Sequence, residues 1–390
     1  MINTFPAAKA VVEKIEKAGF EAVFVGGAVR DYYLNKPQRD VDIATSALPE
    51  EVKAIFQKTV DVGIEHGTVL ILDEGEPIEV TTYRTEGTYS DCRRPDEVQF
   101  VRSLAEDLKR RDFTMNAMAM RSNGELVDLY GGQADIERGV IRAVGEPAER
   151  FGEDALRMLR AVRFAAQLGF AIEPETLQAI VKQSESITRI AKERIAAEME
   201  KLFVSEHVSQ GIHYLVESNL ASYLAGSFAE HEEHFRQFTA SEPVVGWAFL
   251  AYLNDDVDSV VQFYKLSKKA RQFMQQVLEA TKQLQMRWTA YDSYRFEESV
   301  IVTAFQLMAC CGHIPYESLE DVLAEKRALP VKSMQELAVT GHDFIKWAGG
   351  KGGPWLKVAL EELLQAVLSG AVLNNVESIK EWFEHDFNQR

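Results

Sequence analysis

The residues best suited to chemistry begin at Gly26-Gly27 and end at the pair Asp40 and Asp42. Two glycines allow a tight turn and a close approach to a ligand, and a helix beginning there would point free N–H groups at a phosphate. Arg30 adds a charged fork on the same turn. Because side chains alternate along a strand, Asp40 and Asp42 would share one face. Neighbouring carboxylates repel unless a cation lies between them, which indicates Mg²⁺ held jointly with nucleotide phosphates.

These acids also have a plainer explanation. Taken alone, Asp40 and Asp42 fit a solvated edge strand better, because short motifs often match by chance; the glycine turn upstream reverses that preference. Glu79 lies between Ile78 and Val80 in a further predicted strand. It either completes a three-carboxylate cradle for the metal or faces water from a sheet edge, and the pattern fits both equally.

A second group of polar residues follows the cations Lys109-Arg110-Arg111, which end a predicted helix. Cations at that end of a helix can simply balance its dipole. Asp112 and Asn116, directly beyond them, offer hydrogen bonds that suit a sugar hydroxyl.

A third group opens a long predicted helix at residue 153, where Asp154 and Arg157 are three residues apart and therefore neighbours. Carboxylate and guanidinium together present an acceptor–donor edge. Cytosine and adenine carry a complementary amino donor beside a ring nitrogen, whereas guanine and uracil carry the opposite order, so the pair would admit C and A. The alternative is an ordinary ion pair. Arg160 suits the same ligand, whereas Arg163 lies further round the helix.

The elements that must position these groups change character along the chain. The pattern predicts helices over 4–18, 49–56 and 104–111, and strands over 22–25, 68–72 and 77–83. The turn at 73–76 suits a hairpin, and residues 84–97, which lack periodicity, predict a long mobile loop. From 147 onward the pattern is almost wholly helical. The fold class is therefore α+β: a small mixed sheet with helices, followed by an all-α part, with the first boundary near Ile136.

Composition restricts the class of protein further. A chain of 390 residues should divide into two to four units. Three cysteines form no disulfide framework or zinc spacing, and no segment resembles a signal peptide or a membrane span. We therefore expect a soluble, cytoplasmic protein with no evident obligatory protein partner. The net charge of −17 argues against a nucleic-acid partner, although binding depends on local patches.

Three ordered motifs resemble the class II tRNA nucleotidyltransferases, the bacterial CCA-adding enzymes, which are close relatives of poly(A) polymerase. They are Gly26 to Asp31 with Arg39 to Asp42, then Arg110 to Ala117, then Glu153 to Phe164. The resemblance covers roughly the first half of the chain. It implies a nucleotidyltransferase head (palm) over 1–136, a helical neck over 137–204 that recognises the base, a helical body over 205–290 and a helical tail over 291–390.

The resemblance also implies a function and residue roles. The activity would be template-independent addition of C, C and A to the 3′ end of tRNA from CTP and ATP, by two-metal-ion nucleotidyl transfer. Asp40 and Asp42 would hold Mg²⁺, with Glu79 as a candidate third catalytic carboxylate. The residues that would bind the nucleotide are Gly26, Gly27, Arg30, Arg111, Asp112, Asn116, Asp154, Arg157, Arg160 and Arg163. A loop carrying Arg84, Arg93 and Arg94 would govern the switch to ATP, and Lys346, Lys351 and Lys357 are candidates for contacting tRNA.

Related activities remain as alternatives. Poly(A) polymerase shares the head and neck motifs, but Val62 to Val69 looks like the CCA-adding version, and the extended basic insert is absent. An enzyme that adds only CC or only A would differ in the loop over 84–97, which here is full length. A non-catalytic RNA-binding module would have lost an aspartate of the pair. Some relatives carry a phosphohydrolase built on His-Asp ligands; the lone His342-Asp343 and the spacing of His231 and His234 predict none here.

Overall fold

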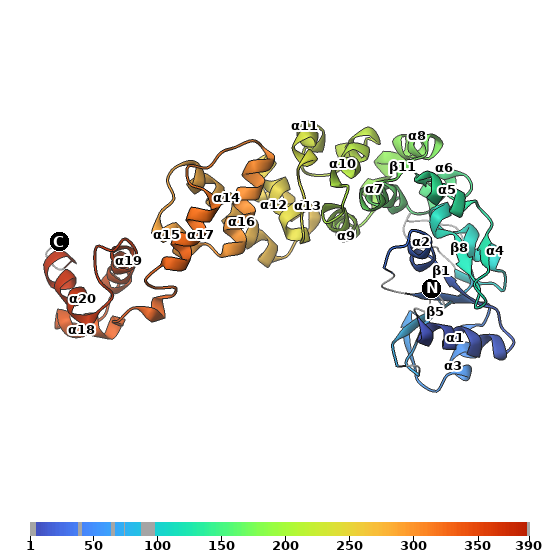
Figure 1. The fold of residues 1–390 in the computed structure, drawn as a ribbon, viewed down its shortest axis with the longest axis horizontal. Coiled ribbons are helices and arrows are strands. Elements are labelled where there is room, and N and C mark those ends of the chain that lie inside the picture. Colours follow the sequence, from blue (N-terminus) through green and yellow to red (C-terminus); the bar gives the residue numbers. More distant parts are fainter. Residues whose placement is uncertain (1–4, 38–40, 64–66, 74, 87–97, 388–390) are drawn as a thin grey trace. The chain divides into compact units, whose positions relative to one another are not determined.

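The computed structural model describes residues 5–37, 41–63, 67–73, 75–86 and 98–387 (Figure 1). The chain divides into two compact units, one formed by residues 1–246 with 262–265 and the other by 247–261 with 266–390.

The first unit contains a mixed sheet of seven strands in the order β3-β4-β5-β2-β1-β8-β9. Strands β2 and β5 pair in parallel, and the other neighbours are antiparallel. The expected small mixed sheet is therefore confirmed. The strands are β1 (Ala22–Val25), β2 (Asp42–Thr45), β3 (Thr59–Gly63), β4 (Thr68–Ile71), β5 (Ile78–Thr82), β8 (Met118–Met120) and β9 (Leu126–Asp128).

Helices cover this sheet as the apolar pattern predicts. Helix α1 (Pro6–Lys17) packs against β1, β2 and β5, and its buried residues recur at helical spacing. Helix α3 (Pro49–Ile55) packs against β4, and proline occupies its first turn, where the missing N–H costs nothing. The β4–β5 hairpin and both helices are confirmed within two residues of their predicted limits. The core cluster of this part is Val23, Val25, Ala44, Tyr83, Leu104, Leu108 and Ala119.

The predicted loop over 84–97 is shorter than expected at its start. Residues Arg84–Glu86 form strand β6, which pairs with β7 (Val98–Phe100) in a separate two-stranded sheet. The prediction that Arg84 belongs to the loop is therefore wrong, because its backbone lies opposite Phe100 in this ladder. Residues 87–97, including Arg93 and Arg94, lie outside the described residues.

Beyond the sheet the first unit is helical, apart from a short parallel pair of β10 (Val140–Ile141) and β11 (Ala171–Ile172). Helix α7 (Leu156–Leu168) is its centre: it packs against α9 (Lys192–Phe203) and α10 (Val208–Glu217). The other elements are α2 (Gly27–Tyr33), α4 (Leu104–Lys109), η2 (Thr114–Asn116), α5 (Gly132–Arg138), α6 (Pro147–Glu153), α8 (Pro174–Gln183), η3 (Ser184–Arg189), η4 (Leu220–Tyr223), α11 (Phe228–His231) and η5 (Glu232–Arg236).

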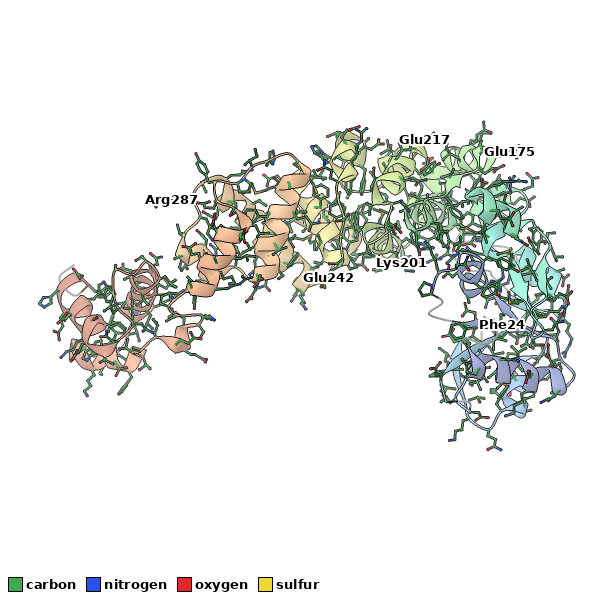
Figure 2. All side chains as sticks on the ribbon, viewed as in Figure 1. Phe24, Glu175, Lys201, Glu217, Glu242 and Arg287 are labelled. Carbon is green, nitrogen blue, oxygen red and sulfur yellow. The ribbon has the colours of Figure 1, made fainter. Side chains whose placement is uncertain are left out.

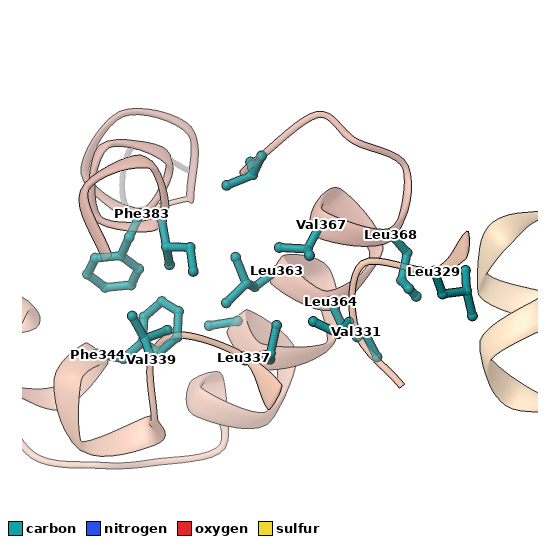
Figure 3. Close-up of a cluster of buried hydrophobic side chains, with 13 residues drawn as sticks. Leu329, Val331, Leu337, Val339, Phe344, Leu363, Leu364, Val367, Leu368 and Phe383 are labelled. Atoms are coloured by element: carbon teal, nitrogen blue, oxygen red, sulfur yellow. The ribbon is translucent and has the colours of Figure 1, made fainter. Parts of the chain in front are cut away.

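The second unit is built from helices. Its C-terminal part surrounds a buried cluster in which the Phe344 and Phe383 rings meet edge to face at 4.9 Å, beside Leu363 and Val367 (Figure 3). Helices α12 (Pro243–Asn254) and α13 (Val257–Tyr264) each contribute to both units. The others are α14 (Lys268–Gln285), α15 (Ala290–Arg295), α16 (Glu298–Cys310), α17 (Leu319–Ala328), η6 (Met334–Glu336), α18 (Gly341–Ala348), α19 (Trp355–Leu368), α20 (Val376–Trp382) and η7 (Phe383–Phe387).

Among the residues that the structure describes, every helix falls short of the length and apolar character that a membrane span requires.

Candidate active site

A cavity of about 640 Å³ in the first unit is lined by all ten of the predicted nucleotide-binding residues. The glycine turn, the start of β2, the segment after α4, and helices α7 and α9 all contribute to its wall. The lining residues are Gly26, Gly27, Arg30, Asp42, Arg110, Arg111, Asp112, Asn116, Asp154, Leu156, Arg157, Arg160, Arg163, Phe164, Gln167, Arg194 and Lys201.

The glycine turn requires glycine at its first position. Gly26 has φ of +70°, a conformation that side-chain-bearing residues rarely adopt. A Cβ on Gly26 would lie 3.2 Å from Arg111 Nη1 and 3.8 Å from Asp42 Oδ2. The turn therefore brings bare backbone close to both a cation and an acid, and α2 begins at the next residue.

The acid at the start of β2 faces away from the core, as predicted. Val41 and Ile43 are buried, whereas Asp42 between them is exposed and reaches the cavity. Asp40 lies outside the described residues.

Glu79 is placed near Asp42 by the strand register. Ile43 pairs with Val80 in the parallel β2–β5 ladder, so Asp42 and Glu79, one residue earlier on each strand, lie on the same face of the sheet. Both side chains are exposed. Within the described ranges, which exclude Asp40, no three His, Cys, Asp or Glu side chains form a group that could hold a metal.

A continuous hydrogen-bonded network crosses the cavity from α2 to α7. Arg30 Nη1 donates to Asn116 Oδ1 at 2.9 Å, and Asn116 Nδ2 donates to Asp112 Oδ1 at 3.0 Å. The second oxygen of Asp112 accepts from Arg160 at 2.7 Å. The network fixes the orientation of every one of these side chains before any ligand is present.

Asp112 carries a strongly shifted pKa. Burial opposes its ionisation, but the Arg160 charge and the Asn116 hydrogen bond outweigh burial and lower the pKa to about 2. A folded-state pKa below the unfolded value stabilises the fold above about pH 4, and this contribution is lost as the pH falls from about 4 to about 2.

We expect this effect to appear in the acid stability of an Asp112→Asn variant. Over that pH range the wild-type free energy of unfolding should fall by about 2 kcal/mol more than that of the variant. Urea titrations at several pH values between 4 and 2 measure both slopes. Parallel curves of unfolding free energy against pH for wild type and variant would show that Asp112 is not held ionised by its neighbours.

The cations after α4 are held by a buried acid. Asp107, 1% exposed, accepts from Arg110 Nη2 at 2.7 Å and from Arg111 Nη2 at 3.2 Å. Burial would raise the pKa of Asp107, but the two guanidinium groups lower it below its usual value. Arg110 also donates to the carbonyl of Arg84 at 3.1 Å. The cluster therefore orients cavity-lining side chains and is more than compensation for a helix dipole.

The expectation of one continuous helix from residue 153 is wrong. Helix α6 ends at Glu153, Asp154 has extended backbone with φ −137° and ψ 104°, and α7 begins at Leu156. The break is stabilised by the side chain of Asp154, whose Oδ1 accepts from the Leu156 N–H at 3.0 Å. Asp154 and Arg157 both line the cavity, but from a helix junction and the first turn of α7.

The two members of this pair are each engaged by other groups. Asp154 Oδ2 lies 2.7 Å from Arg194 Nη2. Arg157, 8% exposed, donates to Glu153 at 2.5 Å and to the carbonyl of Arg110 at 3.0 Å. Arg157 is therefore nearly immobilised by the protein itself.

Arg163 faces the same cavity as Arg157 and Arg160, although it was predicted to lie further round the helix. Its guanidinium carbon lies 3.7 Å from the centre of the Phe164 ring, and its Nη1 donates to Gln167 at 2.6 Å. Its Nε donates to Glu198 of α9 at 2.5 Å.

Helix α9 also contributes to the cavity, which was not predicted from the sequence. Arg194 and Lys201 line the cavity, and Glu198 binds Arg163; Lys201 is labelled in Figure 2. The spacing of these residues, i, i+4 and i+7, puts them on one face of a helix. That periodic polar face was the available signal, although nothing in the sequence indicates what it contacts.

The wall of the cavity is positively charged, although the chain as a whole is negatively charged. Among the residues that the structure describes, eight arginine and lysine side chains line it against three carboxylates, whereas the whole chain carries −17. A polyanion can therefore bind here despite the acidic composition.

Other predicted residues lie elsewhere. Lys346, Lys351 and Lys357 are exposed in the second unit. His231 and His234 have ring centres 5.7 Å apart, and within the described ranges no third ligand joins them.

Models of nucleotidyltransferase and polymerase families match three successive parts of the chain. A family model for the Poly A polymerase head domain matches residues 22–142, one for an RNA and SrmB-binding site of polymerase A matches 169–230, and one for tRNA nucleotidyltransferase domain 2 matches 238–383. The CCA-adding enzyme of Anoxybacillus flavithermus is 43% identical over 98% of this chain and 97% of its own length. That of Bacillus cereus is 42% identical over 98% and 99%. The crystal structure of the Bacillus stearothermophilus CCA-adding enzyme in complex with CTP matches with a TM-score of 0.89 at 40% identity, covering 99% of this chain and 98% of that one.

Proposed function

This chain belongs to the family of CCA-adding enzymes, and from that membership we propose how its own residues carry out the reaction. It is a tRNA nucleotidyltransferase that adds C, C and A to the 3′ end of tRNA from CTP and ATP without a nucleic-acid template. In each addition the 3′ oxygen of the RNA attacks the α-phosphorus of the nucleotide, and the bond to pyrophosphate breaks.

The observation that supports the site assignment best is the single cavity. The glycine turn with Arg30 and Arg111 lies in one part of its wall, and Asp154 and Arg157 lie in another. We propose that the triphosphate binds at the turn, where bare backbone and two guanidinium groups meet. Asp112 and Asn116 would then face the sugar.

The base would be read by Asp154 and Arg157. Asp154 already accepts from Arg194 and from the Leu156 N–H, yet a carboxylate offers about four acceptor positions. A free position remains for the amino group of cytosine or adenine. Arg157, held by Glu153 and a backbone carbonyl, would supply the donor for the neighbouring ring nitrogen. Arg160 and Arg163 would make further nucleotide contacts.

Asp42 and Asp40 are the proposed holders of Mg²⁺, with Glu79 as the candidate third acid. The donor set fits this ion: Asp42 is an exposed carboxylate at the cavity wall, and Glu79 shares its face of the sheet. Bound there, Mg²⁺ would supply Lewis acidity to the attacking 3′ hydroxyl and neutralise charge on the departing pyrophosphate. Gly26 keeps the backbone close enough for the phosphates to approach these acids.

Residues 1–136, 137–204, 205–290 and 291–390 would serve as head, neck, body and tail. The tail would contact tRNA through Lys346, Lys351 and Lys357, all of which are exposed.

Replacing these three lysines with Gln should weaken tRNA binding without changing the chemistry on a bound substrate. Each lost phosphate contact lowers the slope of log K against log salt by about 0.7 to 0.9, so the slope should fall by about 2. Binding titrations at several salt concentrations measure it. A matched triple change at Lys268, Lys269 and Lys332, exposed in the same unit, should leave the slope unchanged; an equal fall in both variants would contradict the assignment.

Product mapping tests the function itself. A tRNA transcript lacking its 3′ CCA is incubated with Mg²⁺, CTP and ATP, and the products are sequenced. We expect CCA to be added once and addition then to stop. Growth of an A tail, or arrest after CC, would identify a different member of the family.

A further inference from the structure

Behind the cavity lies a buried acid with no role in the reaction described above. Glu198 of α9 is 4% exposed. Its carboxylate lies 2.5 Å from Arg163 Nε, 3.5 Å from Lys201 Nζ and 3.8 Å from Arg160 Nη1. All three cations line the cavity, whereas Glu198 lies beneath them. The acid is therefore placed where it acts on the charged wall without touching the ligand.

Glu198 limits what Arg163 can bind. A guanidinium has five N–H donors in a rigid fork, and here Nε is taken by Glu198 and Nη1 donates to Gln167. The Phe164 ring covers one face of the group. The three N–H donors that remain, one on Nη1 and two on Nη2, are thereby held in fixed orientations, which is the condition for reading a specific acceptor.

Glu198 also offsets the repulsion between the cations on this wall. Burial and the neighbouring Arg160 lower the pKa of Arg163, and the Glu198 carboxylate opposes that shift. Arg160 is likewise shared between Asp112 and Glu198. The carboxylate thus separates two arginines that would otherwise repel each other.

We propose that Glu198 is a positioning residue for base selection: it restricts Arg160 and Arg163 to a subset of donors, so that the site discriminates among nucleotides at the expense of general affinity for phosphate. This inference rests on the proposed nucleotide-binding role of the two arginines.

Removal of the Glu198 charge should affect ligand binding differently from removal of an ordinary structural ion pair. Removing the negative charge frees arginine donors and leaves the cavity wall more positive. Triphosphates of every base, and pyrophosphate alone, should then bind as tightly as before or more tightly, while the preference for the correct base falls. If Glu198 only stabilised the fold, its removal would weaken the binding of every ligand by the same factor.

The test compares dissociation constants of CTP, UTP and pyrophosphate for wild type and Glu198→Gln, with Mg²⁺ present. We expect the ratio of the UTP constant to the CTP constant to fall about tenfold, with the pyrophosphate constant unchanged or lower. Glu193→Gln, an exposed acid in the first turn of the same helix, should leave the ratio unchanged. An unaltered ratio in Glu198→Gln, or equal weakening of all three ligands, would overturn the inference.

Glu198→Asp keeps the charge but shortens the side chain by one methylene group. It replaces Glu198→Gln in the same binding measurements if that variant melts below the assay temperature. An intermediate ratio supports the inference, and a wild-type ratio overturns it. Wild type itself separates this inference from the proposed function. If wild type bound CTP and UTP equally, the base-reading site would be wrong. If wild type discriminated between them and the Glu198 variants discriminated equally well, the base-reading site would stand and this inference would fail.

Discussion

Replacing Asp42 with Ala should lower the rate of CMP incorporation into tRNA by about a thousandfold or more. Removing one hydrogen-bond donor from a charge-stabilising site already costs about 10² to 10³ in turnover, and a carboxylate facing a divalent ion contributes more charge than such a donor. The protein should still fold, because the Asp42 side chain is exposed and the core contacts of β2 come from its buried residues.

Incorporation of labelled CMP under single-turnover conditions measures this rate, and thermal melting checks the fold. The matched control is Asp61→Ala, which removes an exposed acid from β3 of the same sheet, 3.4 Å from Lys53. Near-normal turnover by a folded Asp42→Ala protein would refute the catalytic assignment. Equal losses in the two variants would show that any acid of this sheet matters alike.

Replacing Asp154 with Ala should relax base choice more than it slows chemistry. A site built to hydrogen-bond one group rejects analogues because its own buried groups remain unpaired. Without the acceptor, the preference for CTP over UTP should fall about a hundredfold, while CTP incorporation should fall less, because Asp42 and the glycine turn are untouched.

Steady-state kcat/KM values for the four nucleoside triphosphates measure this preference. Glu149→Ala, an exposed acid on α6, is the control and should keep wild-type selectivity. If Asp154→Ala lowered kcat/KM by the same factor for all four nucleotides, Asp154 would support the fold of the helix junction and would not read the base. Because Asp154 also accepts a hydrogen bond from the N–H of Leu156 at the start of α7, Asp154→Asn provides a second variant that can retain this hydrogen bond.

The sequence was most informative where function depends on short local patterns. The buried β-branched strand, the two glycines and the alternation around Val41 specified β1, the turn and the exposed acid of β2 without help from the rest of the chain. Local rules suffice there because a left-handed φ at Gly26 and the two-residue period of a strand are properties of neighbouring residues.

The sequence was misleading at the α6–α7 junction. Residues 153–163 have the apolar spacing of a single helix, yet the chain breaks after Glu153 because Asp154 bonds the Leu156 N–H. Aspartate competes in this way for nearby backbone groups, and here Arg194, 40 residues further along the chain, also holds the carboxylate. Such a partner is invisible to a local pattern.

Net charge misled for a related reason. A sum over the chain cannot show that α7 and α9 bring arginines and a lysine to one cavity together with those of α2 and of the segment after α4. The grouping arises only when α9 packs against α7. The buried Glu198 likewise looks like one acid among many until its three cationic neighbours are known.

The most direct measurement is a crystal structure of this protein with Mn²⁺ and CTP. The account predicts anomalous density for Mn²⁺ against the Asp42 carboxylate, the triphosphate along the turn at Gly26 and Arg30, and the cytosine edge against Asp154 and Arg157. A nucleotide bound elsewhere, or metal and CTP absent from this cavity at saturating concentrations, would contradict it.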